Sequence, residues 1–142
     1  MLLKAGRAAD ARPIIEAQLA AAENAPREEQ YRDVLFQLHE LAARTAAQNG
    51  DRDFAARHYE RAIALLAHAD ARHPYLAATR ARYASLLAQG GDLAGARRQI
   101  ELARPAFEAQ PPPGEQFQRP WRAAQADVRS QARLSVSPPA SA

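Results

Sequence analysis

The residues best suited to acid–base chemistry or metal binding in this chain are its four histidines, His39, His58, His68 and His73. A metal site needs ligands that converge at fixed spacing. His39 and His58 fall on different predicted helices, and neither has a second histidine or a carboxylate four residues on. We therefore interpret the histidines as ordinary surface or turn residues, and we assign His73 to a His-Pro helix start.

Other catalytic groups are scarce. The absence of cysteine excludes disulfides, thiolate zinc sites and cysteine nucleophiles. Ser85, Ser130 and three serines near the C-terminus lie outside any nucleophile-elbow motif. The pair Gly90-Gly91 is typical of a helix cap and not of a phosphate loop. The sequence therefore predicts a protein that is not an enzyme, with no catalytic residues, no metal and no cofactor.

Arginine supplies 18 of the 19 basic residues, and Lys4 is the exception. This bias is typical of phosphate or carboxylate recognition, but a GC-rich genome would produce the same bias together with the many alanines. The net charge of +3 comes from residues 119–142, which hold four arginines against Asp127. A basic final helix makes nucleic acid an alternative partner, although the sequence lacks the aromatic series of a nucleic-acid motif.

The composition is that of one helical domain. The chain has 142 residues, 47% of them hydrophobic, with 36 alanines and 6 glycines, and alanine has the highest helix propensity. No apolar stretch is long enough for a signal peptide or a membrane span. We expect a cytoplasmic protein without a membrane partner.

One stretch of sequence occurs twice. AQNGDRDFAARHYERAIALL begins at Ala47, and AQGGDLAGARRQIELARPAF follows 41 residues later. A fainter copy lies 44 residues before the first, so the chain contains about three similar units. Each unit is expected to hold two helices around a Gly-Asp turn, with glycine closing one helix and aspartate capping the next. The positions that define the repeat are Gly50, Asp51, Ala55, Tyr59, Ala62, Pro74, Gly91, Asp92, Ala96, Ile100 and Ala103.

Six helices are predicted from the apolar spacing, over residues 8–23, 27–49, 52–70, 75–90, 93–109 and 117–134. Residues 1–134 are expected to form one repeat domain, and residues 135–142 a disordered tail. The opening MLLKAG matches the last turn of a helix whose body is missing, which indicates either an atypical end or a fragment of a longer array. Without that partner helix, Ile14 or Ile15 and Leu19 should form an exposed apolar face.

The repeat resembles the tetratricopeptide repeat. Its spacing of a small residue followed by a bulky one appears as Ala55…Tyr59 and Ala96…Ile100. The long period and the His-Pro start at Pro74 are similar to the kinesin-light-chain type. The resemblance implies an all-α fold, an α-solenoid of antiparallel helix pairs with about three repeats, the first incomplete, and a C-terminal capping helix. Pro13 and Pro105 depart from the pattern and should kink or shorten their helices.

In this family the first helix of each unit lines a concave groove. The resemblance therefore implies a partner groove formed by Gln37, Glu40, Arg44, Gln48, Ala78, Arg82, Ser85 and Gln89. Arg44 and Arg82 would clamp an acidic or phosphorylated peptide; alternatively they are solvated helix faces. The groove lacks the Lys and Asn pattern that chaperone-tail binding requires.

The predicted function is a non-catalytic protein–protein interaction module that binds a peptide or helix of a partner. The alternative is a regulatory or oligomerisation segment at the C-terminus of a larger bacterial signalling protein, such as a kinase or transcription regulator. A homodimer through the N-terminal helices is a further expectation. Trp121 is expected to cap the repeats by packing near Ile100 and Phe107, although tryptophan is also common at binding interfaces.

Overall fold

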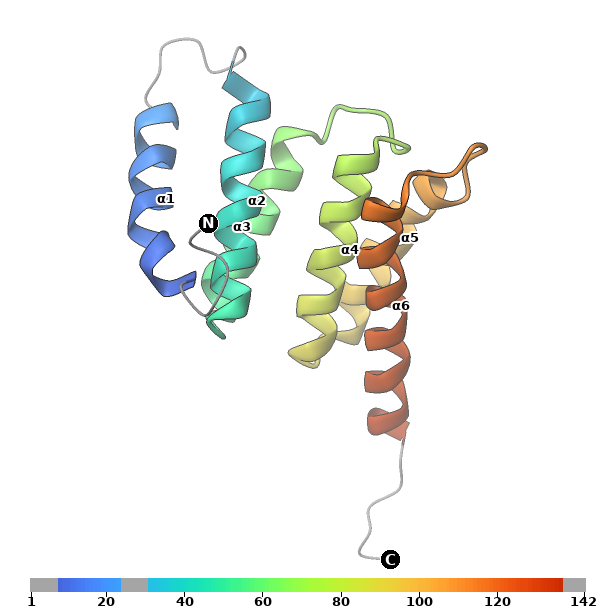
Figure 1. Ribbon diagram of the computed structural model, residues 1–142. Coiled ribbons are helices and arrows are strands. Elements are labelled where there is room, and N and C mark those ends of the chain that lie inside the picture. Colours follow the sequence, from blue (N-terminus) through green and yellow to red (C-terminus); the bar gives the residue numbers. More distant parts are fainter. Residues whose placement is uncertain (1–7, 24–30, 137–142) are drawn as a thin grey trace, which may run out of the picture. The chain divides into compact units, whose positions relative to one another are not determined.

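A computed structural model describes residues 8–23 and 31–136, which form six α-helices and no β-strand. The helices are α1 (Ala8–Glu23), α2 (Arg32–Gln48), α3 (Arg52–Leu65), α4 (Pro74–Gln89), α5 (Leu93–Phe107) and α6 (Glu115–Val136) (Figure 1). The predicted all-α class is confirmed. The chain divides into two compact units, residues 1–69 with α1 to α3 and residues 70–142 with α4 to α6. Whether they join into the predicted single domain stays a prediction.

Most predicted helix bounds agree with the structure to within two residues, with two informative differences, and the expected start of the second helix at residue 27 lies outside the described residues. α3 ends at Leu65, five residues before the expected end. α6 begins at Glu115, two residues before the expected start, and Pro120 lies inside it. The earlier start is stabilised by the Gly114 carbonyl, which accepts hydrogen bonds from the amides of Phe117 and Gln118. The predicted tail overlaps the end of α6 and otherwise lies outside the described residues.

The two Gly-Asp turns have the same geometry. Gly50 has φ 78° and Gly91 has φ 90°, in the left-handed region that favours glycine. The amides of Asp51 and Asp92 each donate to a carbonyl five residues back, at 2.9 and 2.8 Å, as in a Schellman motif. Each aspartate side chain then accepts the amide hydrogen three residues on, which caps α3 and α5. The predicted glycine and aspartate roles are confirmed.

Small side chains fill the helix contacts of the first unit, where α2 packs against both α1 and α3. Ala43 of α2 has no exposed surface, nor do Ala55 and Ala62 of α3. Tyr59, between these two alanines in the sequence of α3, is also buried. An alanine adds only one carbon beyond the backbone, so buried alanines at these contacts allow the paired helices to approach closely. Three of the positions that define the repeat, Ala55, Tyr59 and Ala62, are therefore buried in the first unit.

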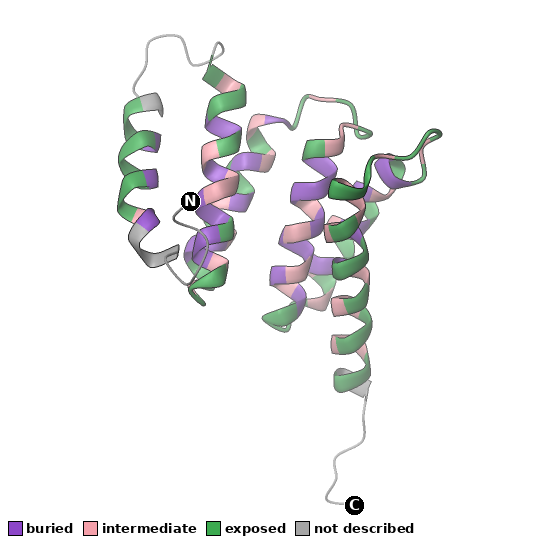
Figure 2. Ribbon diagram, in the orientation of Figure 1, coloured by how far each residue is buried: buried purple, intermediate pink, exposed green. Residues whose placement is uncertain are grey.

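The second unit has a continuous core to which all three helices contribute. α4 packs against α5 and α6, and Trp121 of α6 stacks on Phe107 of α5 with ring centroids 4.5 Å apart. Ile100 belongs to the same buried cluster, so the predicted surroundings of Trp121 are confirmed. The rest of α6 is exposed along most of its length (Figure 2). The cluster comprises Ala77, Ala81, Ala84, Ala88, Ala96, Ile100, Ala103, Ala106, Phe107, Trp121 and Ala124.

The expected exposed face of the N-terminal helix was wrong. Ile15 and Leu19 of α1 are buried, and α1 packs against α2. Only Ile14 of the three named residues is exposed. The side chain of Arg12 adds a second attachment, because its Nη1 donates to Asp51 Oδ2 at 2.8 Å. Most of the apolar face that we expected to be exposed on α1 is therefore buried within the first unit.

Replacing Ala55 with Leu should lower the free energy of unfolding by about 1–3 kcal/mol, because three extra carbons must enter a filled helix crossing. The matched control is Ala64→Leu, on an exposed position of the same helix, which should change stability by less than about 0.5 kcal/mol. Chemical denaturation followed by circular dichroism measures both. Equal unfolding curves for the two variants would contradict the proposed crossing.

Trp121→Ala should lower the free energy of unfolding by about 3–5 kcal/mol, because it removes the largest side chain of the second core and leaves a cavity against Phe107. Leu134→Ala, at an apolar position of α6 that is 71% exposed, is the control and should be nearly neutral. Calorimetry compares the two variants with the parent chain. A similar loss in both variants would show that α6 contributes through helix propensity and not through this contact.

Candidate functional site

The part of the predicted groove that lies on α2 forms an exposed polar stripe. Gln37, Arg44 and Gln48 are exposed. The side chain of Glu40 is mostly covered, and its Oε1 accepts a long hydrogen bond of 3.5 Å from Arg44 Nη1. These residues follow one another at intervals of three or four, so they share one side of the helix. The stripe offers hydrogen-bonding groups to a ligand.

The part that lies on α4 is less open. Ala78 is 2% exposed, so its side chain presents almost no surface to a ligand. Arg82 and Ser85 are half-buried, and Gln89 Nε2 donates to Asp127 Oδ2 of α6 at 3.2 Å. The α2 and α4 residues belong to different units. Their union into a single groove stays a prediction.

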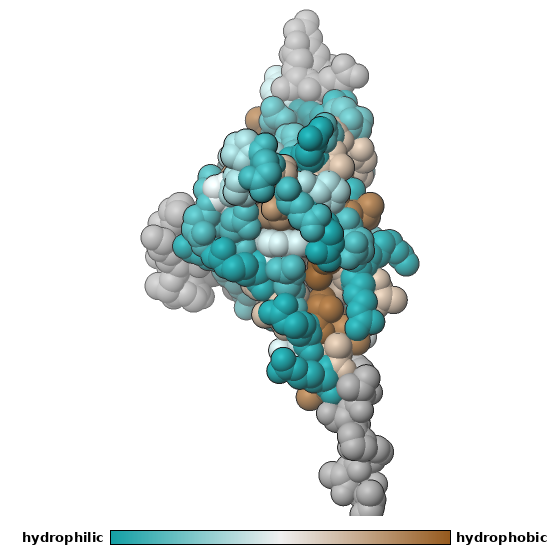
Figure 3. Space-filling model, turned by 90° about the vertical axis from the view of Figure 1, so that its right-hand side faces the viewer, coloured by the Kyte–Doolittle hydropathy of each residue, from teal (hydrophilic) through white to brown (hydrophobic). Residues whose placement is uncertain are grey.

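Within the second unit, α5 and α6 enclose a groove of about 410 Å³ that opens to solvent, here called the α5–α6 groove. Figure 3 looks onto this side of the molecule and shows brown apolar atoms between teal polar ones. This groove depends on how α6 packs beside α5, so the spacing of residues along the sequence does not predict it. The lining residues are Arg97, Ile100, Glu101, Arg104, Gln125, Val128 and Arg129.

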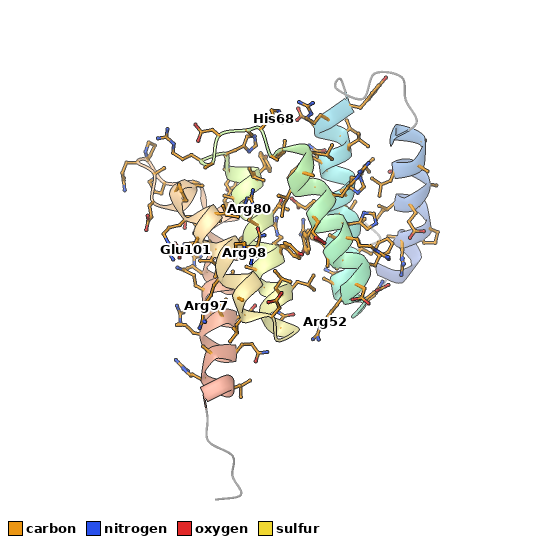
Figure 4. All side chains as sticks on the ribbon, turned by 180° about the vertical axis from the view of Figure 1, so that it is seen from behind. Arg52, His68, Arg80, Arg97, Arg98 and Glu101 are labelled. Carbon is orange, nitrogen blue, oxygen red and sulfur yellow. The ribbon has the colours of Figure 1, made fainter. Side chains whose placement is uncertain are left out.

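Helix periodicity explains which α5 residues reach the groove. α5 buries Ala96, Ile100 and Ala103 against the rest of the unit. Arg97 and Glu101 lie one turn apart at the border of this buried stripe. Arg98, the residue after Arg97, points from another side of the helix (Figure 4). The only available sequence signal was the regular spacing of charged residues along α5.

The charges of the α5–α6 groove are only partly neutralised. Arg104 Nη2 donates to Glu101 Oε1 at 2.8 Å, and this hydrogen bond lowers the pKa of the Glu101 carboxyl. The same bond raises the pKa of Arg104, whose guanidinium also lies 5.7 Å from the Trp121 ring centroid. Arg97 and Arg129 form no ion pair with any described residue. One carboxylate and three guanidinium groups therefore leave the lining with two excess positive charges.

Two histidines that we interpreted as ordinary surface or turn residues meet in the first unit. His39 Nδ1 and His58 Nδ1 lie 2.8 Å apart, and the His39 side chain is buried. The rings are stacked with centroids 5.0 Å apart, and Phe54 lies against His58 at 4.3 Å. The surface interpretation of His39 was wrong. His39 follows the buried residues Phe36 and Leu35 of α2 by three and four positions, and this spacing was the signal available in the sequence.

The helix-start role of His73 is supported by its geometry. His73 is the N-cap of α4, where its Nδ1 accepts a hydrogen bond of 3.4 Å from the Leu76 amide. Pro74 occupies the first helical position, where its missing amide hydrogen costs nothing. His68, in the first unit, contacts Arg32 Nη1 through its Nε2 at 3.0 Å.

Comparisons with known proteins leave the family open, because no family model, curated protein or solved structure matches the chain. Over residues 8–23 and 31–136, no three histidine, cysteine or acidic side chains gather as a metal site would require. No helix in the same residues combines the length and the apolar character needed to cross a membrane. The likeness to tetratricopeptide repeats therefore rests on the repeat within this chain.

The His39–His58 contact can be tested with a double-mutant cycle. His58→Leu should lower the free energy of unfolding by about 1–3 kcal/mol, because buried His39 loses a hydrogen-bond partner. The double variant His39→Leu/His58→Leu should recover part of that loss, since replacing both partners with apolar groups leaves no mismatched pair. Urea denaturation of the parent, both single variants and the double variant measures the coupling. Strictly additive losses would show that the two rings do not stabilise each other.

Proposed function

We propose that this chain is a non-catalytic protein–protein interaction module in the cytoplasm, a short solenoid of the tetratricopeptide type that binds a peptide or helix of a partner. The observation that carries the proposal is the repeated hairpin. α2–α3 and α4–α5 share the same turn, the same aspartate cap and the same buried alanines. Repeats of this kind bury apolar faces by stacking and leave the remaining helix faces for a ligand.

The exposed stripe of α2 supports a peptide-binding role. The opposite side of this helix is occupied by its contacts with α1 and α3. Gln37 and Gln48 offer amide groups suited to the backbone of an extended or helical ligand. Arg44 is held only by a 3.5 Å contact to Glu40 within this stripe, so its guanidinium is suited to a bidentate bond with a partner carboxylate or phosphate.

The proposal is tested by finding the partner and then changing the stripe. Affinity capture from lysate of the source cell, followed by mass spectrometry, identifies candidates, and fluorescence anisotropy with peptides from each candidate locates the bound segment. Arg44→Glu together with Arg82→Glu should weaken binding of that segment at least tenfold, about 1.4 kcal/mol, because two attractive charges become repulsive.

The matched control is Arg52→Glu with Arg98→Glu, which makes the same charge change at exposed positions outside the predicted groove. This control should bind within about twofold of the parent chain, since exposed charges remote from a ligand act weakly at physiological salt. Full affinity in the Arg44/Arg82 variant, with its helical signal intact, would move the binding surface away from α2 and α4.

A further inference from the structure

We propose that the α5–α6 groove is a second binding site, separate from the α2 and α4 surface, and that it takes an acidic peptide segment with an aliphatic side chain between carboxylates. The proposal rests on three properties of the groove: its apolar floor, two arginines that form no ion pair with a described residue, and the attachment of α6 to the core. The second unit alone carries the whole site.

The floor of the groove is aliphatic. Ile100 is 6% exposed and belongs to the buried core, and Val128 is half-buried against that core. A volume of about 410 Å³ is near the lower end of the range for ligand pockets, roughly 300–1,000 Å³. The floor therefore has room for a small apolar group, and a leucine-sized side chain would remove apolar surface from water on both partners.

The rim of the groove selects for negative charge. Arg104 is engaged by Glu101 at 2.8 Å and lies 3.7 Å from Glu108. Arg97 and Arg129, which form no ion pair among the described residues, keep their donors available. Each planar guanidinium can hold one carboxylate through two parallel hydrogen bonds. Two carboxylates flanking an aliphatic side chain therefore match the two arginines around the floor.

The lining favours a peptide over nucleic acid. Single-stranded nucleic acids are held by aromatic side chains on which bases stack, and none of the lining residues is aromatic. The aromatic ring that lies near the lining residue Arg104, that of Trp121, is buried and stacked on Phe107. Glu101 places a carboxylate inside the groove that would repel a phosphate chain, whereas a peptide can leave that position neutral.

The groove is held in shape before a ligand arrives. The stacking of Trp121 on Phe107 fixes α6 to α5 near one end of the contact. Gln89 Nε2 of α4 donates to Asp127 Oδ2 of α6, next to Val128 in the sequence. Because both walls are helices anchored in the core, binding does not have to order a loop, which lowers its entropic cost.

The test uses a fluorescein-labelled synthetic peptide with the sequence AEELEEA and anisotropy at low salt. We expect saturable binding that weakens at least tenfold when the four glutamates become glutamines, and at least fivefold when the leucine becomes serine. Arg97→Glu with Arg129→Glu should weaken binding of the parent peptide at least tenfold. Arg98→Glu with Arg119→Glu, an equal charge change at exposed positions outside the lining, should stay within twofold.

Circular dichroism and the unfolding midpoint of each variant establish that it is folded. If the charge reversal lowers that midpoint, Arg97→Gln with Arg129→Gln replaces it and should still weaken binding at least fivefold. The Arg44/Arg82 variant should bind the peptide as the parent chain does. Loss of peptide binding in that variant alone would contradict a binding site in the α5–α6 groove and would assign the peptide to the predicted surface on α2 and α4.

Three other results would overturn the proposal. Equal binding of the leucine and serine peptides would show attraction to charge alone, without use of the floor. Tighter binding of a labelled oligothymidylate, lost in the Arg97/Arg129 variant, would assign the groove to nucleic acid. Self-association of the parent chain in sedimentation that disappears in the same variant would make a second copy the occupant.

Discussion

The close approach of paired helices through alanine side chains is the constraint on which each unit depends. Ala55 and Ala62 of α3, and Ala96 and Ala103 of α5, have no exposed surface. Helix axes can come to about 8 Å only where such small residues meet the partner helix. Larger side chains alternate with these alanines along both helices, and Tyr59 of α3 and Ile100 of α5 are themselves buried. The alanines therefore leave room for the bulky residues of the repeat to pack beside them.

Helices this close need a short connection, and the Gly-Asp turn supplies it. Gly50 and Gly91 reverse the chain with a positive φ that other residues adopt at a cost. Asp51 and Asp92 follow at once with almost the same backbone angles, φ −88° and ψ 79° in one and φ −87° and ψ 79° in the other. Each carboxylate satisfies an amide that the new helix leaves unbonded. The repetition in the sequence is thus a repetition of one local geometry.

Features set by local chemistry could be predicted from the sequence, whereas features set by the meeting of distant segments could not. The role of Gly50 follows from backbone sterics, and the burial of Ala55 from helix periodicity. Trp121 was predictable because it is the largest apolar group on an amphipathic helix. The contact of His39 with His58, 19 residues apart, depends on the rotation of α2 against α3, and no spacing rule along one helix contains that information. The α5–α6 groove was missed for the same reason.

The arginine bias of the composition carries little functional information until the partners of each arginine are known. Arg12 is used for structure: it donates to Asp51 at 2.8 Å, and its guanidinium carbon lies 3.8 Å from the Phe54 ring centroid. Arg104 is likewise committed, since it bonds Glu101 in the same turn of helix. A guanidinium that already holds a carboxylate has fewer donors for a ligand and gains less by meeting one. The composition does not contain this difference, but the fold does, because it pairs some arginines and leaves Arg97 and Arg129 beside an aliphatic floor. The proposed recognition of acidic partners therefore rests on how the helices distribute the charge and not on how much charge the chain carries.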